Sequence, residues 1–230
     1  MRRMSRSVWL GGLFCLGGCA SPVSTGPAAG APSTATKYDF DAGEIGTVPA
    51  GFTSARTGEG SRGTWVVQVG DDAPLRERVL AQTDDDATEG RYPLCLADAV
   101  SARDVRASVQ FQTRSGEIDQ AAGIVVRCRD AQTYYLVRAN ALEGNVRFYR
   151  VLNGVRKQLG SAVVPVTGRT WHKLLVEARG ESFRIEYDGR TLYTVEDATL
   201  QRAGKAGLWT KADSVTWFDD FVIESFDAER

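Results

Sequence analysis

The chain has 230 residues, and its 28 lysines and arginines are balanced by 29 aspartates and glutamates, so the formal net charge is -1. This balance gives no electrostatic argument for nucleic-acid binding, which needs a clear excess of positive charge. The sequence has one histidine and no Cys-x-x-Cys spacing, which argues against a zinc site.

The first 18 residues have the pattern of an export signal. A basic stretch, Met1 to Arg6, precedes a short apolar run, Ser7 to Gly18. The run is shorter than the roughly 20 residues that a permanent membrane-spanning helix needs, and a basic segment before a short apolar segment is typical of a signal peptide. We therefore expect residues 1–18 to be removed on export.

The end of the apolar run, Leu16-Gly17-Gly18-Cys19, resembles the lipobox of bacterial lipoproteins. The resemblance implies that lipid is attached to the Cys19 thiol and that the domain meets a membrane through this anchor. The alternative is an ordinary signal peptide with chance cysteines. After cleavage the second residue would be Ala20 rather than aspartate, which by analogy with lipoprotein sorting predicts an outer-membrane location in the cell envelope.

We expect residues 19–36 to consist of the lipidated cysteine and a flexible linker. Ala20 to Thr36 is rich in small residues and proline and has no charge, which is typical of a flexible linker. Residues 37–230 then form one domain, long enough for a hydrophobic core. Within this domain the polar, acidic section from Asp71 to Glu89 predicts a loop, with a hint of a short helix from Leu75 to Leu80.

From Val105 onward, short strands are separated by turns. In the first strand, Val105, Val109 and Phe111 fall on one face. Asn153-Gly154 lies between two β-prone runs and predicts a hairpin, and Asp188-Gly189 predicts a second turn. This alternation predicts an all-β antiparallel two-sheet sandwich. The expected strands cover residues 105–112, 121–128, 134–140, 145–151, 171–178, 183–187, 191–195, 204–210 and 215–224.

Five segments of this domain resemble one known family. They are Ala122 to Arg127, Asp130 to Asn145, Thr170 to His172, Gly207 to Ser214 and Phe218 to Phe221. They resemble the concanavalin A-like jelly-roll domains grouped with the 3-keto-disaccharide hydrolase domain, long a domain of unknown function. The resemblance covers most of Tyr38 to Ser225. It implies a jelly roll whose concave face meets carbohydrate.

Strand parity predicts which side chains lie on that concave face. Where Tyr135 and Val137 point to the core, the residues between them point outward. Aromatic rings and forked donors suit sugars, and several cations together suit an acidic sugar or another anionic ligand. The alternative is a solvated sheet face. The predicted ligand-binding residues are Arg127, Arg138, Asn140, Arg147, Tyr149, Trp209 and Lys211.

The sequence leaves open whether the domain is an enzyme. Glu117-Ile118-Asp119 resembles the start of the catalytic motif of laminarinase-type glycosidases, but the second glutamate is missing, which excludes that mechanism and places the trio in a loop before Ala121. The family name suggests proton abstraction beside a ketone, for which Glu143 is the candidate base. The one histidine, His172, is in phase with core positions and is expected to be packed.

Two further groups of residues have alternative explanations. Cys95 and Cys128 form a disulfide or stay as free buried thiols, and the phase of Cys128 with Val126 favours a core-facing side chain. Asp219 is in phase with apolar residues, and a buried carboxylate needs a partner. A structural Ca2+ is one hypothesis, and an Asp–Arg pair or backbone hydrogen bonds are the other. The calcium ligands would be Asp39 or Asp41 with Asp219 or Asp220.

Three functions follow from these observations. The leading hypothesis is a lipid-anchored cell-envelope protein whose β-sandwich binds carbohydrate on its concave face. The second is a hydrolase or lyase of 3-keto-glycosides that acts on the same face. The third is a structural envelope lipoprotein that binds protein.

Overall fold

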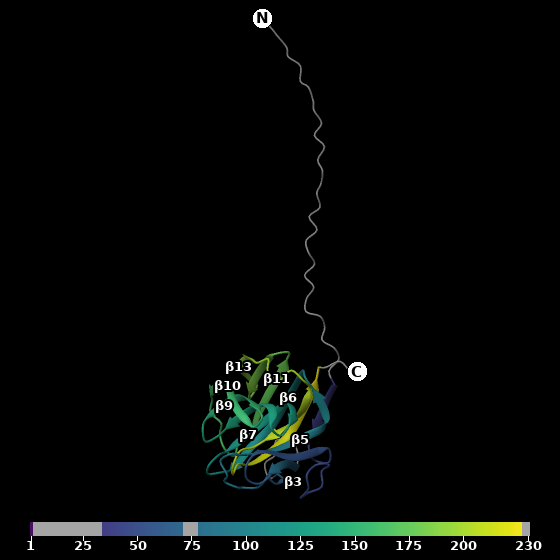
Figure 1. Ribbon diagram of the computed structural model, residues 1–230, viewed down its shortest axis with the longest axis vertical. Helices are drawn as coiled ribbons and strands as arrows, with labels where there is room; N and C mark the ends of the chain where they lie inside the picture. The colour runs from purple at the N-terminus through teal and green to yellow at the C-terminus, as the bar shows by residue number, and fades with distance from the viewer. Residues whose placement is uncertain (2–33, 71–77, 227–230) are drawn as a thin grey trace.

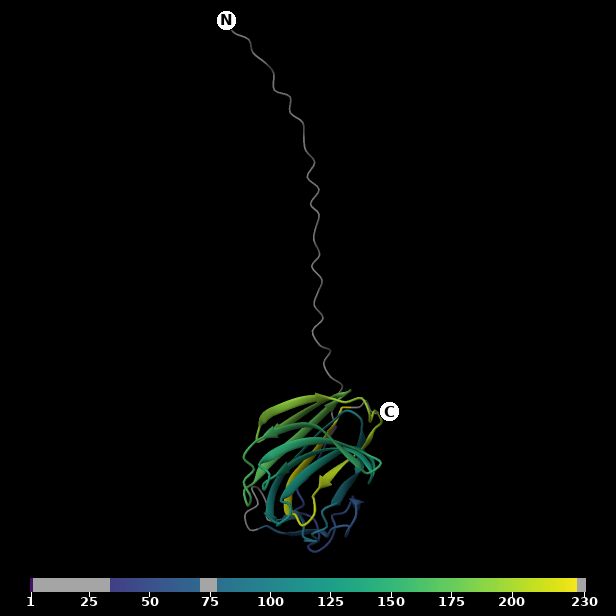
Figure 2. The same ribbon diagram turned by 60° about the vertical axis from the view of Figure 1, so that its left-hand side comes forward.

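The computed structural model describes Met1, residues 34–70 and residues 78–226. These residues form two antiparallel sheets packed face to face, as Figure 1 and Figure 2 show from two sides. The predicted all-β jelly-roll sandwich is therefore confirmed. In the part of the chain that is described, no helix is long and apolar enough to cross a membrane. The predicted signal peptide and Cys19 lie outside the described residues.

Each sheet is built from strands that are distant in the sequence. The eight-stranded sheet has, in spatial order, β13 (Arg190–Glu196), β12 (Ser182–Tyr187), β11 (His172–Arg179), β6 (Val105–Ser115), β15 (Val215–Ser225), β4 (Arg78–Gln82) and β3 (Trp65–Val69), and β1 (Thr34–Tyr38) also pairs with β15. The seven-stranded sheet has β10 (Val155–Val163), β9 (Asn145–Leu152), β8 (Thr133–Asn140), β7 (Ala121–Asp130), β14 (Gly204–Trp209), β5 (Arg91–Ala102) and β2 (Phe52–Gly58).

The core lies between the two sheets, and alternate residues of the central strands fill it. Val109 and Phe111 of β6 are fully buried there, as their alternation predicts. Aromatic rings from both sheets meet in this layer, where Tyr135 and Phe183 have ring centroids 4.4 Å apart. His172 is also buried and packs on Phe111, which confirms its expected position.

Both predicted turns are present. Asn153 and Gly154 connect β9 to β10 with φ angles of 51° and 77°, and Asp188 and Gly189 connect β12 to β13 with φ angles of 47° and 75°. Two successive positive φ angles are the geometry of a tight hairpin turn, which Asn-Gly and Asp-Gly adopt at low cost.

The prediction of a loop with a short helix before residue 89 is wrong for residues 78–82, which form β4. This strand lies between β15 and β3, and Val79, Leu80, Ala81 and Gln82 are all buried. A strand that is buried on both faces has no polar–apolar alternation, so the usual strand signal is missing. The acidic residues that follow β4 are typical of a loop, which is why the sequence predicts a loop for the whole section.

A bulge in β7 changes which way its last residues point. The pairing of β7 with β8 is irregular between Val126 and Asp130. As a result Cys128 packs on the opposite face from Val126, so the expected core-facing orientation is wrong. Cys95 lies in the core, and both cysteines are free buried thiols rather than a disulfide.

Candidate functional site

Three loops meet at one end of the sandwich. They connect β6 to β7 (residues 116–120), β8 to β9 (residues 141–144) and β14 to β15 (residues 210–214). The backbone N–H of Ala141 donates to the carbonyl of Gln120 at 2.9 Å, which holds the first two loops side by side. We call the polar side chains that these loops bring together the loop-end site.

Asp213 fixes the loop that carries Asp119. Its carboxylate accepts hydrogen bonds from the backbone N–H groups of Glu117 at 2.6 Å, Ile118 at 3.0 Å and Asp119 at 2.9 Å. The loop starts at Gly116, whose φ of 146° and close approach to the Asp119 carbonyl leave no room for a Cβ. The expected loop before Ala121 is confirmed, and it points Asp119 into the site.

The Asp119 carboxylate is almost fully buried and has a partner on each oxygen. The Asn140 amide donates to Oδ1, and the Lys211 ammonium pairs with Oδ2. Burial raises the pKa of the Asp119 carboxyl above its ordinary value, although Lys211 acts in the opposite direction. Asp119 is therefore easier to protonate than an ordinary surface aspartate.

Glu143 is held by arginines. Arg138 donates from Nη1 and Nη2 to its two oxygens at 3.0 and 3.1 Å, and Arg147 Nη1 lies 2.9 Å from Oε2. The hydrogen bonds from Arg138 are the main reason why the pKa of Glu143 falls to about 2. A carboxylate with such a low pKa is a weak base at neutral pH. This geometry therefore supports a binding role for Glu143 better than a catalytic one.

Most of the predicted ligand-binding side chains lie on the outer face of the seven-stranded sheet, the face turned away from the core. Arg138 Nη2 donates to the Tyr149 hydroxyl at 3.3 Å, which links the glutamate to the middle of this face. Arg138 and Asn140 are buried. Glu143, Arg147 and Lys211 are partly exposed, with 34%, 33% and 19% of their side-chain area accessible to solvent. The members that meet here are Arg138, Asn140, Arg147, Tyr149 and Lys211.

Arg127 is not part of this group, so its predicted outward orientation is wrong. The β7 bulge gives it a φ of 50° and turns it inward. Its buried guanidinium donates to the carbonyls of Arg103 at 2.7 Å, Leu200 at 3.0 Å and Gly180 at 2.6 Å. Arg127 therefore ties together the far ends of several strands.

Trp209 lies on the outer face but is fully buried. The ring of Tyr92 stacks on it with centroids 5.6 Å apart and planes at 15°. Gly123 makes room for the indole, because a Cβ there would lie 3.1 Å from the Trp209 ring. The rings that cover this part of the face are Tyr92 and Tyr149, and the guanidinium of Arg156 lies over both of them.

Sequence reasoning missed two members of the loop-end site. Asp119 was noted only as part of a glycosidase-like trio, and its pairing with Lys211, 92 residues away, depends on loop geometry. Asn145 donates to Glu143 Oε2 at 3.1 Å and was not singled out. The only available signal was its place at the end of the predicted 140–145 loop.

The predicted calcium ligands do not form a complete metal site. Among the described residues, no group of three or more His, Cys, Asp or Glu side chains is placed to hold a metal ion. Asp220 pairs with Lys37 at 2.7 Å, and the Asp219 Oδ1 atom accepts the Asp220 N–H. In the described part of the chain, Asp219 Oδ2 has no hydrogen-bond partner, and burial raises the Asp219 pKa to about 6. Calcium stays a prediction.

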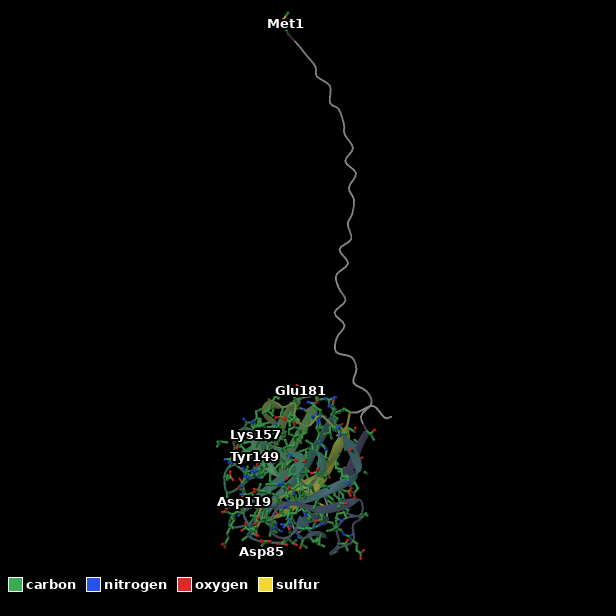
Figure 3. All side chains as sticks on the ribbon, in the orientation of Figure 1. Met1, Asp85, Asp119, Tyr149, Lys157 and Glu181 are labelled. Carbon is green, nitrogen blue, oxygen red and sulfur yellow. The ribbon has the colours of Figure 1, made fainter. Side chains whose placement is uncertain are left out.

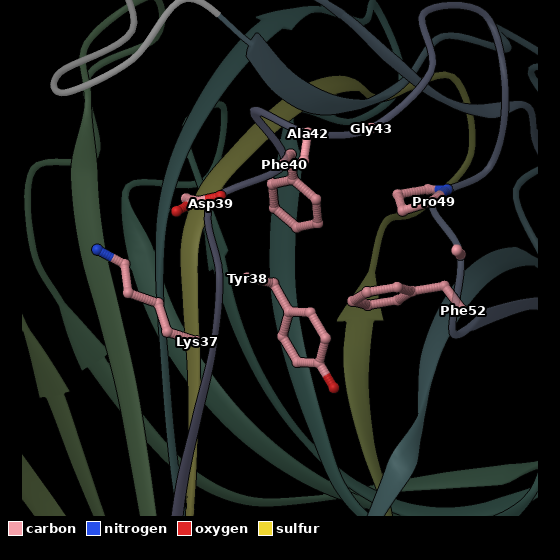
Figure 4. Close-up of a pocket in the computed structure, with 9 residues that line it drawn as sticks. Lys37, Tyr38, Asp39, Phe40, Ala42, Gly43, Pro49 and Phe52 are labelled. Carbon is pink, nitrogen blue, oxygen red and sulfur yellow. The ribbon is translucent and has the colours of Figure 1, made fainter.

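A separate cavity of about 250 Å³ lies between β1 and the start of β2. Figure 4 shows the rings of Tyr38, Phe40 and Phe52 grouped around it, and the Tyr38 and Phe52 centroids are 4.8 Å apart. Most of its lining is aromatic or aliphatic. Lys37 and Asp39 are the charged residues of its lining, and we regard the cavity as part of the seam between the sheets.

Comparison with known proteins relates the chain to one family. The family described as "Beta xylosidase C-terminal Concanavalin A-like domain" matches residues 80–210, which is more than half of the chain. These residues include the first two loops of the loop-end site and end at Thr210, the first residue of the third loop. No curated protein matches the chain.

Several solved structures share the fold. A carbohydrate-binding module, CBM66, from Bacillus subtilis has a TM-score of 0.60 and 22% identity, with coverage of 76% of this chain and 96% of that one. A β-glucanase from Bacillus licheniformis has a TM-score of 0.53 and 13% identity, with coverage of 89% and 100%. A GH43 protein from the same species has a TM-score of 0.55 and 16% identity. The aligned region covers 81% of this chain and 38% of that protein.

Proposed function

The chain belongs to the family of beta-xylosidase C-terminal concanavalin A-like domains, and from this premise we propose that its β-sandwich binds carbohydrate at the loop-end site. The observation that carries the proposal is the pair of fixed carboxylates, Asp119 and Glu143, with cationic donors beside them. Sugar hydroxyls both donate and accept hydrogen bonds. A rigid group of charged donors and acceptors can therefore hold them in one orientation.

The similar structures support this proposal through their names. CBM66 is a carbohydrate-binding module, and a GH16 protein from Bacteroides ovatus, with a TM-score of 0.54, is described in complex with a glucan product. Both are less than 25% identical to this chain, so they support the class of ligand and leave the sugar itself to experiment.

We further propose that the domain is lipid-anchored in the cell envelope. The support is the Leu16-Gly17-Gly18-Cys19 lipobox after a basic and apolar leader. Metabolic labelling with a palmitate analogue tests this. Label that enters the wild-type protein and is lost in Cys19→Ser is the expected result, and label retained in that variant contradicts the anchor.

A glycan-array screen of the unlipidated Cys19→Ser chain tests carbohydrate binding. Saturable binding that falls at least tenfold in Glu143→Gln and in Lys211→Ala is expected, because each change removes a charged group of the site. Lys173→Ala is the matched control, since Lys173 is an exposed lysine on β11 of the other sheet. Absence of binding to any glycan, together with a co-purifying envelope protein, would favour the structural alternative.

One observation favours the enzymatic alternative. The Asp119 carboxyl has a raised pKa and touches Lys211, so it is a better proton acceptor for 3-keto-glycoside cleavage than Glu143. Turnover of a 3-keto-glycoside that Asp119→Asn abolishes would establish this activity. Sugar binding without turnover would leave the domain as a binding module.

A further inference from the structure

Arg156 is a cation on the outer face whose side chain is not paired with an acid among residues 34–70 and 78–226. It lies at the start of β10, directly opposite Val151 of β9, and opposed residues of an antiparallel pair share one face. Val151 packs with Leu136 and Trp209 in the outer-face cluster, so Arg156 points to that face as well. It is partly buried and reaches solvent.

The Arg156 guanidinium lies over two aromatic rings. Its Cζ lies 5.0 Å from the Tyr92 ring centroid and 4.6 Å from the Tyr149 ring centroid. Four strands separate β10 from β5, which carries Tyr92, so this contact also shows that the sheet curls around its outer face. Within the described part of the chain, no hydrogen bond or ion pair of the Arg156 side chain is found.

An arginine that lies on aromatic rings is well placed to bind an anion. Stacking on rings fixes the plane of the guanidinium and leaves its N–H edge free, and that edge matches a carboxylate through two parallel hydrogen bonds. A guanidinium that is already ordered loses little conformational entropy on binding. The neighbouring cations Arg138 and Arg147, in contrast, already bind Glu143.

The site of Arg156 is continuous with the loop-end site. Both Arg156 and Arg138 contact the Tyr149 ring, and the Arg138 Cζ is 5.8 Å from its centroid. Figure 3 labels Asp119 and Tyr149 on one side of the sandwich. Arg138, Arg147 and Lys211 are each paired with Glu143 or Asp119, so among the described residues Arg156 is the cation of this group that has no carboxylate partner.

We propose that Arg156 is an anion subsite that binds the carboxylate of a uronic acid residue, so that the ligand of this face is an acidic carbohydrate. This inference rests on the proposed carbohydrate binding at the loop-end site. A ligand would place its hydroxyls against the exposed groups Glu143 and Lys211 and its carboxylate on the edge of Arg156, with Tyr149 beside it.

The test compares each acidic ligand with its own neutral form. Oligosaccharides of polygalacturonate, alginate and glucuronoxylan are titrated by calorimetry into the Cys19→Ser chain, each beside its carboxyl-reduced form. We expect at least one acidic oligosaccharide to bind tenfold or more tightly than its reduced form. In Arg156→Gln this preference should fall to threefold or less. Lys157→Gln, which removes an exposed charge from the next residue, should keep the preference.

Further variants and outcomes distinguish a wrong anion subsite from a wrong carbohydrate-binding proposal. Arg156→Lys keeps a positive charge over the rings and should keep an intermediate preference, which distinguishes loss of the subsite from loss of the fold. Equal binding of acidic and reduced forms, sensitive to Glu143→Gln, would overturn the anion subsite and leave carbohydrate binding intact. A preference that survives in Arg156→Gln would also overturn the subsite. No binding of any acidic or reduced form would overturn both proposals.

Discussion

At the residue scale, Asp213 is the side chain on which the loop-end site depends most. It accepts three backbone N–H groups of the loop that carries Asp119. Asp213→Ala should lower the free energy of unfolding by about 2–4 kcal/mol, because three backbone donors lose their partner and the N–H of Asp119 is buried. Urea denaturation measures this loss, and a change below about 0.5 kcal/mol, the range of an ordinary surface substitution, would contradict it.

Asp219 should make stability fall as the pH rises. Burial raises its pKa from 3.8 to about 6 in the folded protein. The folded state therefore holds the proton more tightly than the unfolded state. The resulting stabilisation is complete below about pH 4 and is lost as the pH rises through about 6, with a total near 3 kcal/mol. Denaturation between pH 4 and 8 in EDTA should show this slope for the wild type.

Asp219→Asn is the matched variant for this prediction, since it keeps the shape of the side chain and removes the titration. The difference in stability between wild type and variant should change across this pH range, and a constant difference would contradict the raised pKa. The same pair tests the calcium hypothesis. Calcium that raises the melting temperature of the wild type but not of Asp219→Asn would support a metal ligand there.

At the element scale, the β7 bulge shows where sequence reasoning stops. Simple alternation assigns Arg127 to the outer face and Cys128 to the core, and both assignments fail at the register shift between Val126 and Asp130. No glycine or proline marks this bulge, and a positive φ at an arginine has no local sequence signal. In contrast, the strand at β6 and the two hairpin turns follow from alternation and from Asn-Gly and Asp-Gly pairs, which are local features.

The bulge gives Arg127 a structural role that can be measured. Its buried guanidinium satisfies three backbone carbonyls from three different segments. Arg127→Met should therefore lower the free energy of unfolding by about 3–5 kcal/mol, because those acceptors lose their donors in the interior. Arg127→Lys should recover only part of this, since one ammonium cannot reproduce the planar fork. An Arg127→Lys variant as stable as the wild type in chemical denaturation would show that the hydrogen bonds of Arg127 to the three carbonyls do not stabilise the fold.

The candidate site can be predicted from the sequence only where its strands are regular. Parity on β8 and β9 placed Arg138, Asn140 and Tyr149 on one face correctly, because those strands are regular. The covering of Trp209 by Tyr92 was not predictable, since it requires that β5 be recognised as a strand and placed beside β14. Contacts between distant segments, such as Asp119 with Lys211, need the topology first.

At the scale of the whole molecule, the two ends of β15 separate the candidate site from the N-terminal strand. Thr34 of β1 pairs with Ser225 at the end of β15, whereas the loop-end site adjoins Val215 at its start. With about 3.3 Å per residue, this strand places the two roughly 30 Å apart. In Figure 3, Asp119 is labelled well below Glu181, which follows β11 at the same end as Ser225.

If Cys19 carries lipid, the chain enters the domain at the end opposite the loop-end site, so we expect the anchor to leave the three loops accessible. Lipidated protein on vesicles should therefore bind a soluble glycan with an affinity within about threefold of the unlipidated chain, a difference below 1 kcal/mol. As a control, the Cys19→Ser chain carrying Glu117→Cys can be coupled to a maleimide lipid, which anchors it beside the site. This second attachment should weaken binding at least tenfold, because the membrane then covers the three loops. Equal binding from both attachments, measured by vesicle sedimentation, would show that the orientation of the domain does not control access to its ligand.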